Sequence, residues 1–372
     1  MGALDGLKVA DFSWVGAGPR STKDLADNGA TVVKVESSVR LDLGRRSPPF
    51  AGGDRRNPDA SVFFAQTNTS KKSVTINLSD PRGVEVAKKL IAWADVVVEN
   101  FGPGYMDRIG LDWETLQQVK PGVILASVSV AGRSGPLSGL RGYGNSAAAW
   151  SGHCDMTGWP ETEPHMPPFA YGDVVAPMML TVAILSALEH RDRTGEGVHV
   201  DVSQIEAMVH VIGDLFAELP TDKPANEDAE MTPHGVFPCK DDRWIAIACE
   251  TDAQRMALAG VLGDGSVEHA TANWDLVELE QRLIQAGVPA AAVLDGKGLS
   301  EHPDLNAAGH FVAVEHPVIG IANMPAPPYL LPDTPSDVGP SPCLGADNLF
   351  VFAEIGLTDA EVQDLTAKGV LV

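Results

Sequence analysis

The stretch LKVADFSWVGAGPRSTKDLADNGATVVKVE, residues 7–36, decides the fold of this chain. It opens with an apolar run of strand length, LKVADFS, and closes with a second such run, ATVVKVE. Between the two runs, a turn rich in Gly and Pro leads into a helical pattern that ends at Gly29. The order strand, helix, strand predicts a βαβ unit with parallel strands.

The alternation of strands and helices continues beyond this unit. The expected helices include residues 81–94, with Pro81 in the first turn, and a shorter one at 113–120. Further expected strands are residues 72–78, 95–101, 122–130 and 195–203. This alternation predicts an α/β fold with a parallel, Rossmann-like sheet that is covered by helices on both faces. Ligands of such sheets bind beyond the carboxyl ends of the strands.

The composition changes after the α/β part. Residues 217–234 are polar and rich in Pro, which predicts a linker. Residues 235–300 contain two strand patterns around a charged turn, followed by helical patterns, and therefore predict a small α+β domain. From residue 301 onward the alternation resumes and leads to a closing helix.

The charge of the chain is strongly negative but unevenly distributed. It has 27 Lys and Arg against 50 Asp and Glu, a net charge of −23, which argues against nucleic acid and anionic membranes as partners. Residues 1–110, however, hold 15 of the 27 basic residues and only 13 of the 50 acidic ones. Loop-like sequence in this part carries a basic cluster that is either a solvated surface or an anion site. The members of this basic cluster are Arg40, Arg45, Arg46, Arg55, Arg56, Lys71 and Lys72.

Other features exclude further classes of protein. The four Cys residues are far apart and form no CxxC pair, so neither a metal site nor a disulfide framework is expected. Residues 1–12 lack the charged and apolar regions of an export signal, so we expect a cytoplasmic protein. Residues 174–190 are apolar almost all round, but with Pro177 they are too short for a bilayer and predict a buried helix.

Two local motifs indicate where chemistry could occur. The turn Gly16-Ala17-Gly18-Pro19 lacks the third Gly of the dinucleotide fingerprint, which argues against NAD or FAD. An open turn of this kind still suits a phosphate or pantetheine group. Asp173 directly precedes the apolar helix. It is either the N-cap of that helix or a reactive carboxylate that the helix terminus holds ionised against an apolar wall.

Six motifs, in order along the chain, resemble those of the family III CoA-transferases, the CaiB/BaiF family. They are FSWVGAGP (12–19), ATVVKVE (30–36), TNTSKKSVTINL (67–78), VVVENFGPGYMDRIGLDWETL (96–116), FAYGDVVAP (169–177) and HRDRTGEGVHVDVSQIEAM (190–208). The resemblance implies a CoA-transferase built as an interlocked homodimer. It also implies that residues 1–216 and 301–372 together form the large domain, with the small domain inserted.

The resemblance also implies the site residues. Asp173 would be the catalytic nucleophile, forming an aspartyl anhydride and then an aspartyl-CoA thioester. Coenzyme A and acyl-CoA would be substrates, and no prosthetic group or metal is called for. The residues expected to bind CoA are Asn100, Phe101, Tyr105, Arg108, Lys72, Arg40, Val15, Gly16 and Ala17.

The substrate branch stays open among several alternatives. Gly16 stands where formyl-CoA transferases have Gln, which argues against formyl or oxalate specificity. The 2-methylacyl-CoA racemases pair their Asp with a His, but Tyr143 stands at the corresponding position here. The stretch CDMTGWPE (154–161) resembles a two-subunit branch that acts on aromatic acids, so a heteromeric enzyme is a third alternative. Residues that would line an acceptor pocket, or equally the core, are Trp14, Tyr143, Trp150 and His153.

Overall fold

The computed structural model describes residues 1–213 and 225–372, which form two compact units. Within the described residues, the first unit contains Met1–Cys154, the segment that begins at Met166, and Ala307–Val372. The second unit contains Asp155–His165 and the segment that ends at Asn306. The predicted linker, residues 217–234, lies partly outside the described residues.

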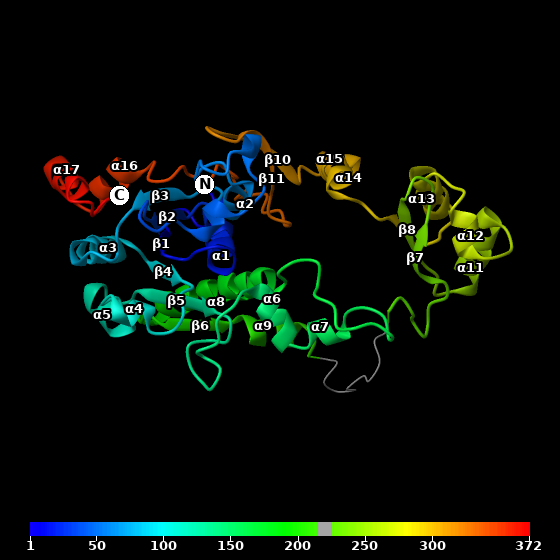
Figure 1. Cartoon of the computed structure of the whole chain (residues 1–372), viewed down its shortest axis with the longest axis horizontal. Helices are drawn as coiled ribbons and strands as arrows, with labels where there is room; N and C mark the ends of the chain where they lie inside the picture. Colours follow the sequence, from blue (N-terminus) through cyan, green and yellow to red (C-terminus); the bar gives the residue numbers. More distant parts are fainter. Residues whose placement is uncertain (214–224) are drawn as a thin grey trace. The chain divides into compact units, whose positions relative to one another are not determined.

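A six-stranded, entirely parallel sheet organises the first unit (Figure 1) and confirms the predicted α/β class. The strand order is β3-β2-β1-β4-β5-β6, so the chain reverses its direction of travel across the sheet between β3 and β4. The carboxyl ends of β1 and β4 flank this switch point, where α/β sheets bind ligands. The strands are β1 Lys8–Asp11, β2 Thr31–Glu36, β3 Lys72–Thr75, β4 Val96–Glu99, β5 Ile124–Ser129 and β6 His199–Ser203.

Alternate residues of these strands feed two separate cores, one on each face of the sheet. In β4, for example, Val97 belongs to one core, while Val96 and Val98 belong to the other. The helices on the first face are α3 Pro81–Trp93, α4 Tyr105–Arg108, α5 Trp113–Val119, α16 Asn348–Glu354 and α17 Asp359–Ala367. Those on the second face are α1 Ala17–Asp27, α8 Gly172–Thr194 and α9 Gln204–Val211.

The C-terminal segment completes the edge of the sheet beside β3. Asp347 Oδ2 accepts from the Ser73 N–H at 2.9 Å, and Asn348 Oδ1 accepts from the Thr75 N–H at 2.8 Å. Figure 1 shows α16 next to β3. The two ends of the chain therefore share one core, to which Phe352 contributes a fully buried ring.

Helix α8 is long and apolar enough, by length and composition alone, to cross a membrane. In the structure it packs against α1 and the sheet, and Ala176, Leu180 and Ile184 are completely buried there. The residues of α8 therefore form the buried core helix that the sequence predicts, although the face bearing Met178 and Val182 is exposed. The helix ends at Gly195, whose φ of 78° is the left-handed conformation that favours glycine.

The second unit is a small α+β assembly. Its antiparallel sheet has the order β7-β8-β9, with strands His234–Pro238, Trp244–Ala248 and Ala290–Ala292. The helices α11 Asp252–Leu262, α12 Val267–Thr271 and α13 Leu276–Gln285 pack against this sheet around one apolar cluster.

The first unit adds the hairpin β10–β11, Phe311–His316 and Gly320–Pro325. The remaining short helices are α2 Val62–Thr67, α6 Gly144–Trp150, α7 His153–Met156, α14 Gly296–Ser300 and α15 Pro303–Ala307.

Candidate active site

Asp173 lies in the first turn of α8 and does not cap it. The helix begins at Gly172, and its N-cap is Tyr171, which makes no capping hydrogen bond through its side chain. The interpretation of Asp173 as an N-cap is therefore wrong, because the N-cap is Tyr171, two residues earlier in the chain. The Asp173 carboxylate is therefore not engaged in capping α8, and it points toward neighbouring helices.

Two glycines enclose the Asp173 carboxylate. A Cβ atom on Gly16 would lie 3.1 Å from Cγ of Asp173, and one on Gly144 would lie 2.9 Å from the same atom. The Gly144 position would also place its Cβ only 2.5 Å from the Asp173 backbone nitrogen. Any other residue at these positions would displace the carboxylate, so the space around Asp173 depends on both glycines.

Four helices begin next to this carboxylate. Gly16 is the N-cap of α1, Gly144 is the first residue of α6, and Gln204 is the first residue of α9. Asp173 itself is in the first turn of α8. Gln204 Nε2 donates a hydrogen bond of 2.7 Å to Asp173 Oδ1. The N-terminal ends of helices carry partial positive charge, so their convergence stabilises an anion at this point.

The pKa of Asp173 reflects a balance of opposing effects. Burial raises the pKa above its ordinary value, while the hydrogen bond from Gln204, the N–H of Gly144 and the charge of Arg20 each lower it. These three groups stabilise the carboxylate over the acid. The pKa of Asp173 is nevertheless raised overall, because these groups offset only part of the effect of burial. In its ionised form, a partly desolvated carboxylate is suited to nucleophilic attack.

The loop that connects β1 to α1 leads from the switch point of the sheet to Asp173. The Trp14 N–H donates to Asn100 Oδ1 at 2.7 Å, and Asn100 Nδ2 donates to the Trp14 carbonyl at 2.7 Å. This reciprocal pair ties the carboxyl ends of β1 and β4 together. Two residues later, Gly16 meets Asp173. Because fully extended backbone covers roughly 3.5 Å per residue, the two points are at most about 7 Å apart along the chain.

Val15, in the middle of this loop, has a φ of 65°. A β-branched residue in this region is strained, at a cost of about 1–3 kcal/mol, and persists only where its surroundings hold it. The Val15 N–H donates to Asp42 Oδ1 at 2.9 Å, and this carboxylate also accepts from the Gly44 N–H at 2.8 Å. The loop conformation therefore depends on a carboxylate that lies beyond β2.

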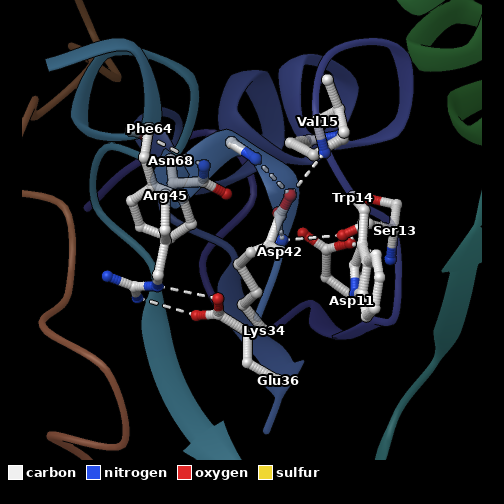
Figure 2. Close-up of polar contacts among 12 residues, drawn as sticks. Asp11, Ser13, Trp14, Val15, Lys34, Glu36, Asp42, Arg45, Phe64 and Asn68 are labelled. Atoms are coloured by element: carbon white, nitrogen blue, oxygen red, sulfur yellow. Dashed lines mark hydrogen bonds and ion pairs between the residues drawn. The ribbon is translucent and has the colours of Figure 1, made fainter. Parts of the chain in front are cut away.

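A buried network of charges supports this loop (Figure 2). Lys34 Nζ lies 2.9 Å from Asp42 Oδ2 and also donates to the Ser13 carbonyl at 2.6 Å. Next to it, Arg45 donates to both oxygens of Glu36 at 2.8 and 2.7 Å, and its guanidinium lies 3.7 Å from the centre of the Phe64 ring. Removal of one partner from a buried ion pair leaves the other charge uncompensated and costs stability. These pairs therefore hold the loop in one conformation.

A groove at the carboxyl ends of β1 to β4 brings several predicted CoA-binding residues together. Arg40, Phe101 and Tyr105 line it, together with Trp14, which was predicted for the acceptor pocket. The Phe101 ring centre lies 5.6 Å from that of Trp14 and 4.4 Å from that of Tyr105, and the Arg40 guanidinium lies 5.3 Å above the Trp14 ring. An exposed guanidinium beside aromatic rings can bind a phosphate and a stacked base or pantetheine chain.

Other predicted residues lie elsewhere. Lys72 is the first residue of β3, at the amino end of the strand, and pairs with Asp347 at 3.6 Å. The structure therefore does not bring Lys72 to the groove. Arg108 is exposed, with its guanidinium 5.7 Å above the Tyr105 ring, and the Ala17 side chain is buried in the core.

The other residues predicted for the acceptor pocket differ in their surroundings. Tyr143 and Trp150 are more than half exposed on α6 and its N-cap, whereas His153 is buried. His153 hydrogen-bonds to Ser151 Oγ at 2.9 Å and lies 5.7 Å, between ring centres, from Tyr171. Both of these contacts are with residues that precede Asp173 in the chain.

The basic cluster does not act as one surface. Arg45 and Lys71 are buried in ion pairs, Lys71 with Asp11 at 3.0 Å, whereas Arg46 and Arg55 are exposed. Of the cluster, Arg40 lines the groove. The exposed members fit the solvated surface, and Arg45 and Lys71 belong to the buried network. The anion site stays a prediction for Arg40.

The sequence interpretation missed Arg20, Gly144 and Gln204. Arg20 directly follows the Gly16–Pro19 turn, in the region where the missing third glycine argues against a dinucleotide site. Gln204 begins a helix directly after an expected strand, at the edge of a parallel sheet where functional side chains gather. This position is the signal that could have identified Gln204.

Comparisons of the sequence and the fold with known proteins identify the family of this chain. The sequence profile of CoA-transferase family III matches residues 4–271 and 264–348. The chain is 28% identical over 398 residues to the succinyl-CoA–D-citramalate CoA-transferase of Chloroflexus aurantiacus, covering 99% of this chain and 98% of the relative. It is 30% identical over 400 residues to the alpha subunit of succinyl-CoA–L-malate CoA-transferase from Chloroflexus aurantiacus, covering 99% and 92%. A solved CAIB/BAIF family protein from Brucella suis matches with a TM-score of 0.87 and 29% identity, covering 95% of this chain and 99% of that one.

Proposed function

Because this chain belongs to CoA-transferase family III, we propose that it moves CoA from an acyl-CoA donor to a carboxylic acid through covalent intermediates on Asp173. The observation that supports this role best is the enclosure of the Asp173 carboxylate by Gly16, Gly144 and Gln204 at the start of four helices. The family identifies the enzyme class, and this geometry supports the choice of Asp173 as the nucleophile.

The proposed reaction needs only a carboxylate nucleophile. Asp173 attacks the thioester carbonyl of the donor, so that a C–O bond forms, the C–S bond breaks, and a mixed anhydride and CoA thiolate result. The thiolate then attacks the Asp173 carbonyl of the anhydride, which releases the donor acid as a carboxylate and leaves an aspartyl-CoA thioester. The acceptor carboxylate runs the same two steps in reverse. No proton is transferred in any of these steps.

The surroundings of Asp173 support such intermediates. Anhydrides and thioesters hydrolyse in water, and the buried start of α8, including Val175 and Ala176, limits access of water from the core side. The Gly144 N–H and Gln204 Nε2 point at the carboxylate and are placed to stabilise negative charge that develops on its oxygens.

The groove at the switch point is the proposed binding site for CoA. Its aromatic residues and Arg40 would hold the nucleotide, and the loop from Trp14 to Gly16 would direct the thiol end toward Asp173. Phe101 and Asn100 would act in different ways, the first by contact with the ligand and the second by fixing Trp14.

We also propose an interlocked homodimer in the cytoplasm, in which residues 1–216 and 301–372 form the large domain around an inserted small domain. The exposed apolar face of α8, with Met178 and Val182, supports an association of subunits. Light scattering after size-exclusion chromatography tests the dimer. A heteromeric enzyme would instead require a second, related chain for activity.

The test of the proposed function is covalent trapping. The purified protein is incubated with succinyl-CoA, the donor named for two relatives, or with acetyl-CoA, and the intermediate is trapped with hydroxylamine or borohydride. We expect the label on Asp173, and Asp173→Asn should form no CoA adduct and lose at least about a thousandfold in kcat. An Asp173→Asn variant with full activity would refute the proposal. Exchange of the α-proton of a 2-methylacyl-CoA without an acid acceptor would favour the racemase alternative.

A matched control separates loss of the nucleophile from loss of folding. Asp304 is an exposed carboxylate in the first turn of α15. Asp304→Asn should retain full activity and the full CoA adduct. Circular dichroism spectra of both variants should match that of the wild type.

A further inference from the structure

Arg20 is a half-buried cation near the candidate nucleophile, and it forms no ion pair with any residue that the structure describes. It lies in the second turn of α1, and its Nε is buried without a hydrogen-bond partner among residues 1–213 and 225–372. Burial lowers the pKa of Arg20, while the negative charges of Asp173 and Asp24 raise it. A shielded guanidinium nitrogen normally has a hydrogen-bond partner, so the unpaired Nε leaves one donor of Arg20 available to an anion.

The neighbouring helices place Arg20 beside the reacting carboxylate. Helix α1 packs along α8, and the N–H of Arg20 donates to the carbonyl of Gly16, the glycine that contacts Asp173. Arg20 and Asp173 influence each other electrostatically, since each appears among the charges that shift the pKa of the other. Asp24, one turn further along α1, is held by Thr181 of α8 at 3.4 Å.

We propose that Arg20 binds the carboxylate of the acceptor acid while Asp173 carries CoA as a thioester. This inference rests on the proposed function, because it requires the thioester intermediate. A single negative charge passes through the reaction, first on Asp173, then on the CoA thiolate, and then on the free acid. One fixed cation can therefore serve every stage without moving.

The charge balance gives the reason for binding at this stage. In the resting protein the ionised Asp173 partly compensates Arg20. Formation of the aspartyl thioester removes that charge and leaves Asp24 as the remaining negative charge that acts on the half-buried Arg20. An incoming carboxylate restores the compensation. The site thus attracts an acid when the thioester has formed and favours its release when Asp173 is free again.

The attacking geometry is consistent with this assignment. The acceptor oxygen must approach the carbonyl carbon of the Asp173 thioester, which is uncharged, so the acid needs a separate group to orient it. A guanidinium can hold one carboxylate oxygen through two donors and leave the other free to attack. Arg20 then contacts the substrate directly and counts as a catalytic residue.

The test compares two ways of consuming the same intermediate. The wild type and Arg20→Met are loaded with succinyl-CoA, and the CoA–enzyme adduct is followed by intact-protein mass spectrometry. Succinate is then added to one portion and neutral hydroxylamine to another. Succinate must be an acceptor if it is released during loading, because the loading step is reversible.

We expect Arg20→Met to raise the apparent KM for succinate by about ten- to a hundredfold, the range for a lost charge-assisted hydrogen bond. Consumption of the thioester by hydroxylamine should change by less than about twofold, since hydroxylamine carries no carboxylate. Arg20→Lys should recover part of the succinate effect. Arg193→Met, which changes an arginine on α8 with a 70% exposed side chain, is the control and should behave as the wild type.

Each other outcome has a distinct meaning. If Arg20→Met consumes the adduct with succinate as fast as the wild type, the inference fails while the proposed function stands. If the succinate and hydroxylamine reactions slow equally, Arg20 is only structural and the inference also fails. If the wild type forms no adduct with succinyl-CoA or acetyl-CoA, the proposed function itself fails.

Discussion

Gln204 Nε2 donates to Asp173 Oδ1 at 2.7 Å and so joins the first residue of α9 to the first turn of α8. The side-chain oxygen of Gln204 is buried without a partner among the described residues. The hydrogen bond to the Asp173 carboxylate therefore orients the Gln204 amide. This arrangement stabilises the ionised form of Asp173 against the effect of burial.

Replacement of Gln204 should shift the pH dependence of the reaction. In Gln204→Leu one of the groups that lower the pKa of Asp173 is lost, so that pKa rises and the acidic limb of the kcat/KM profile moves to higher pH. At neutral pH we expect kcat/KM to fall by about ten- to a hundredfold, the range for a hydrogen bond to a charged group. Gln118→Leu, at an exposed position on α5, is the control. An unchanged pH profile would show that the bond does not influence Asp173.

Replacement of Gly16 tests the space around the carboxylate. The φ of Gly16 is −112°, which suits any residue, so Gly16→Ala introduces no backbone strain. Its Cβ would lie 3.1 Å from Cβ and Cγ of Asp173 and would displace the side chain. We expect kcat to fall by about a hundredfold, because small misplacements of a nucleophile are costly, with a melting temperature within a few degrees of the wild type. Gly139→Ala, where a Cβ meets nothing within 4 Å, should retain both.

Replacement of Arg40 tests the groove. Arg40→Met removes an exposed charge that lies over Trp14, so the KM for acyl-CoA should rise by about tenfold and depend less on salt, while kcat changes little. Lys72→Met is the informative comparison, since Lys72 already pairs with Asp347 at the other end of β3. Steady-state kinetics at two salt concentrations measure both. Equal effects of the two substitutions would place the phosphates outside the groove.

Asp24 should make the folded state less stable as the pH rises. Burial raises the pKa of Asp24 from 3.8 to about 6, so the folded state holds the proton more tightly than the unfolded state. This contribution is fully present below pH 3.8 and is lost as the pH rises through about 6. Asp24→Asn should therefore be more stable than the wild type at pH 7, by up to about 3 kcal/mol, and the difference should shrink toward pH 4.

Urea denaturation at several pH values measures this difference. The amide can still accept the hydrogen bond from Thr181, so the substitution retains that contact. Glu354→Gln, an exposed carboxylate on α16, should show no such dependence on pH. A difference that grows toward acidic pH would contradict the assignment of the raised pKa to Asp24.

The sequence was sufficient for the elements that have a strong local signal. Apolar strands followed by turns, such as residues 95–101 before Gly102, predicted β4 and pointed to the groove at its carboxyl end. The pattern around Asp173 left the N-cap and the reactive carboxylate open, and the family resemblance supplied the prediction of a nucleophile. These signals lie within a few residues of one another along the chain.

The missing parts depend on packing between distant segments. Gln204 reaches Asp173 only because α9 follows β6 and packs beside α8. Likewise, the division of the basic cluster depends on Glu36 and Asp59 being close enough to pair with Arg45. A run of basic residues looks alike whether its members are buried in ion pairs or exposed, so the sequence pattern could not distinguish Arg45 from Arg46.

The shared core of the two chain ends has a consequence for synthesis. Val351 and Phe352 of α16 fill the core against β3, and Asp347 closes hydrogen bonds on the same strand. A nascent chain that has emerged only through β6 therefore leaves this apolar surface uncovered. Folding of the first unit can finish only after residues near 350 have left the ribosome, and until then the unfinished core is a site for chaperone binding or aggregation.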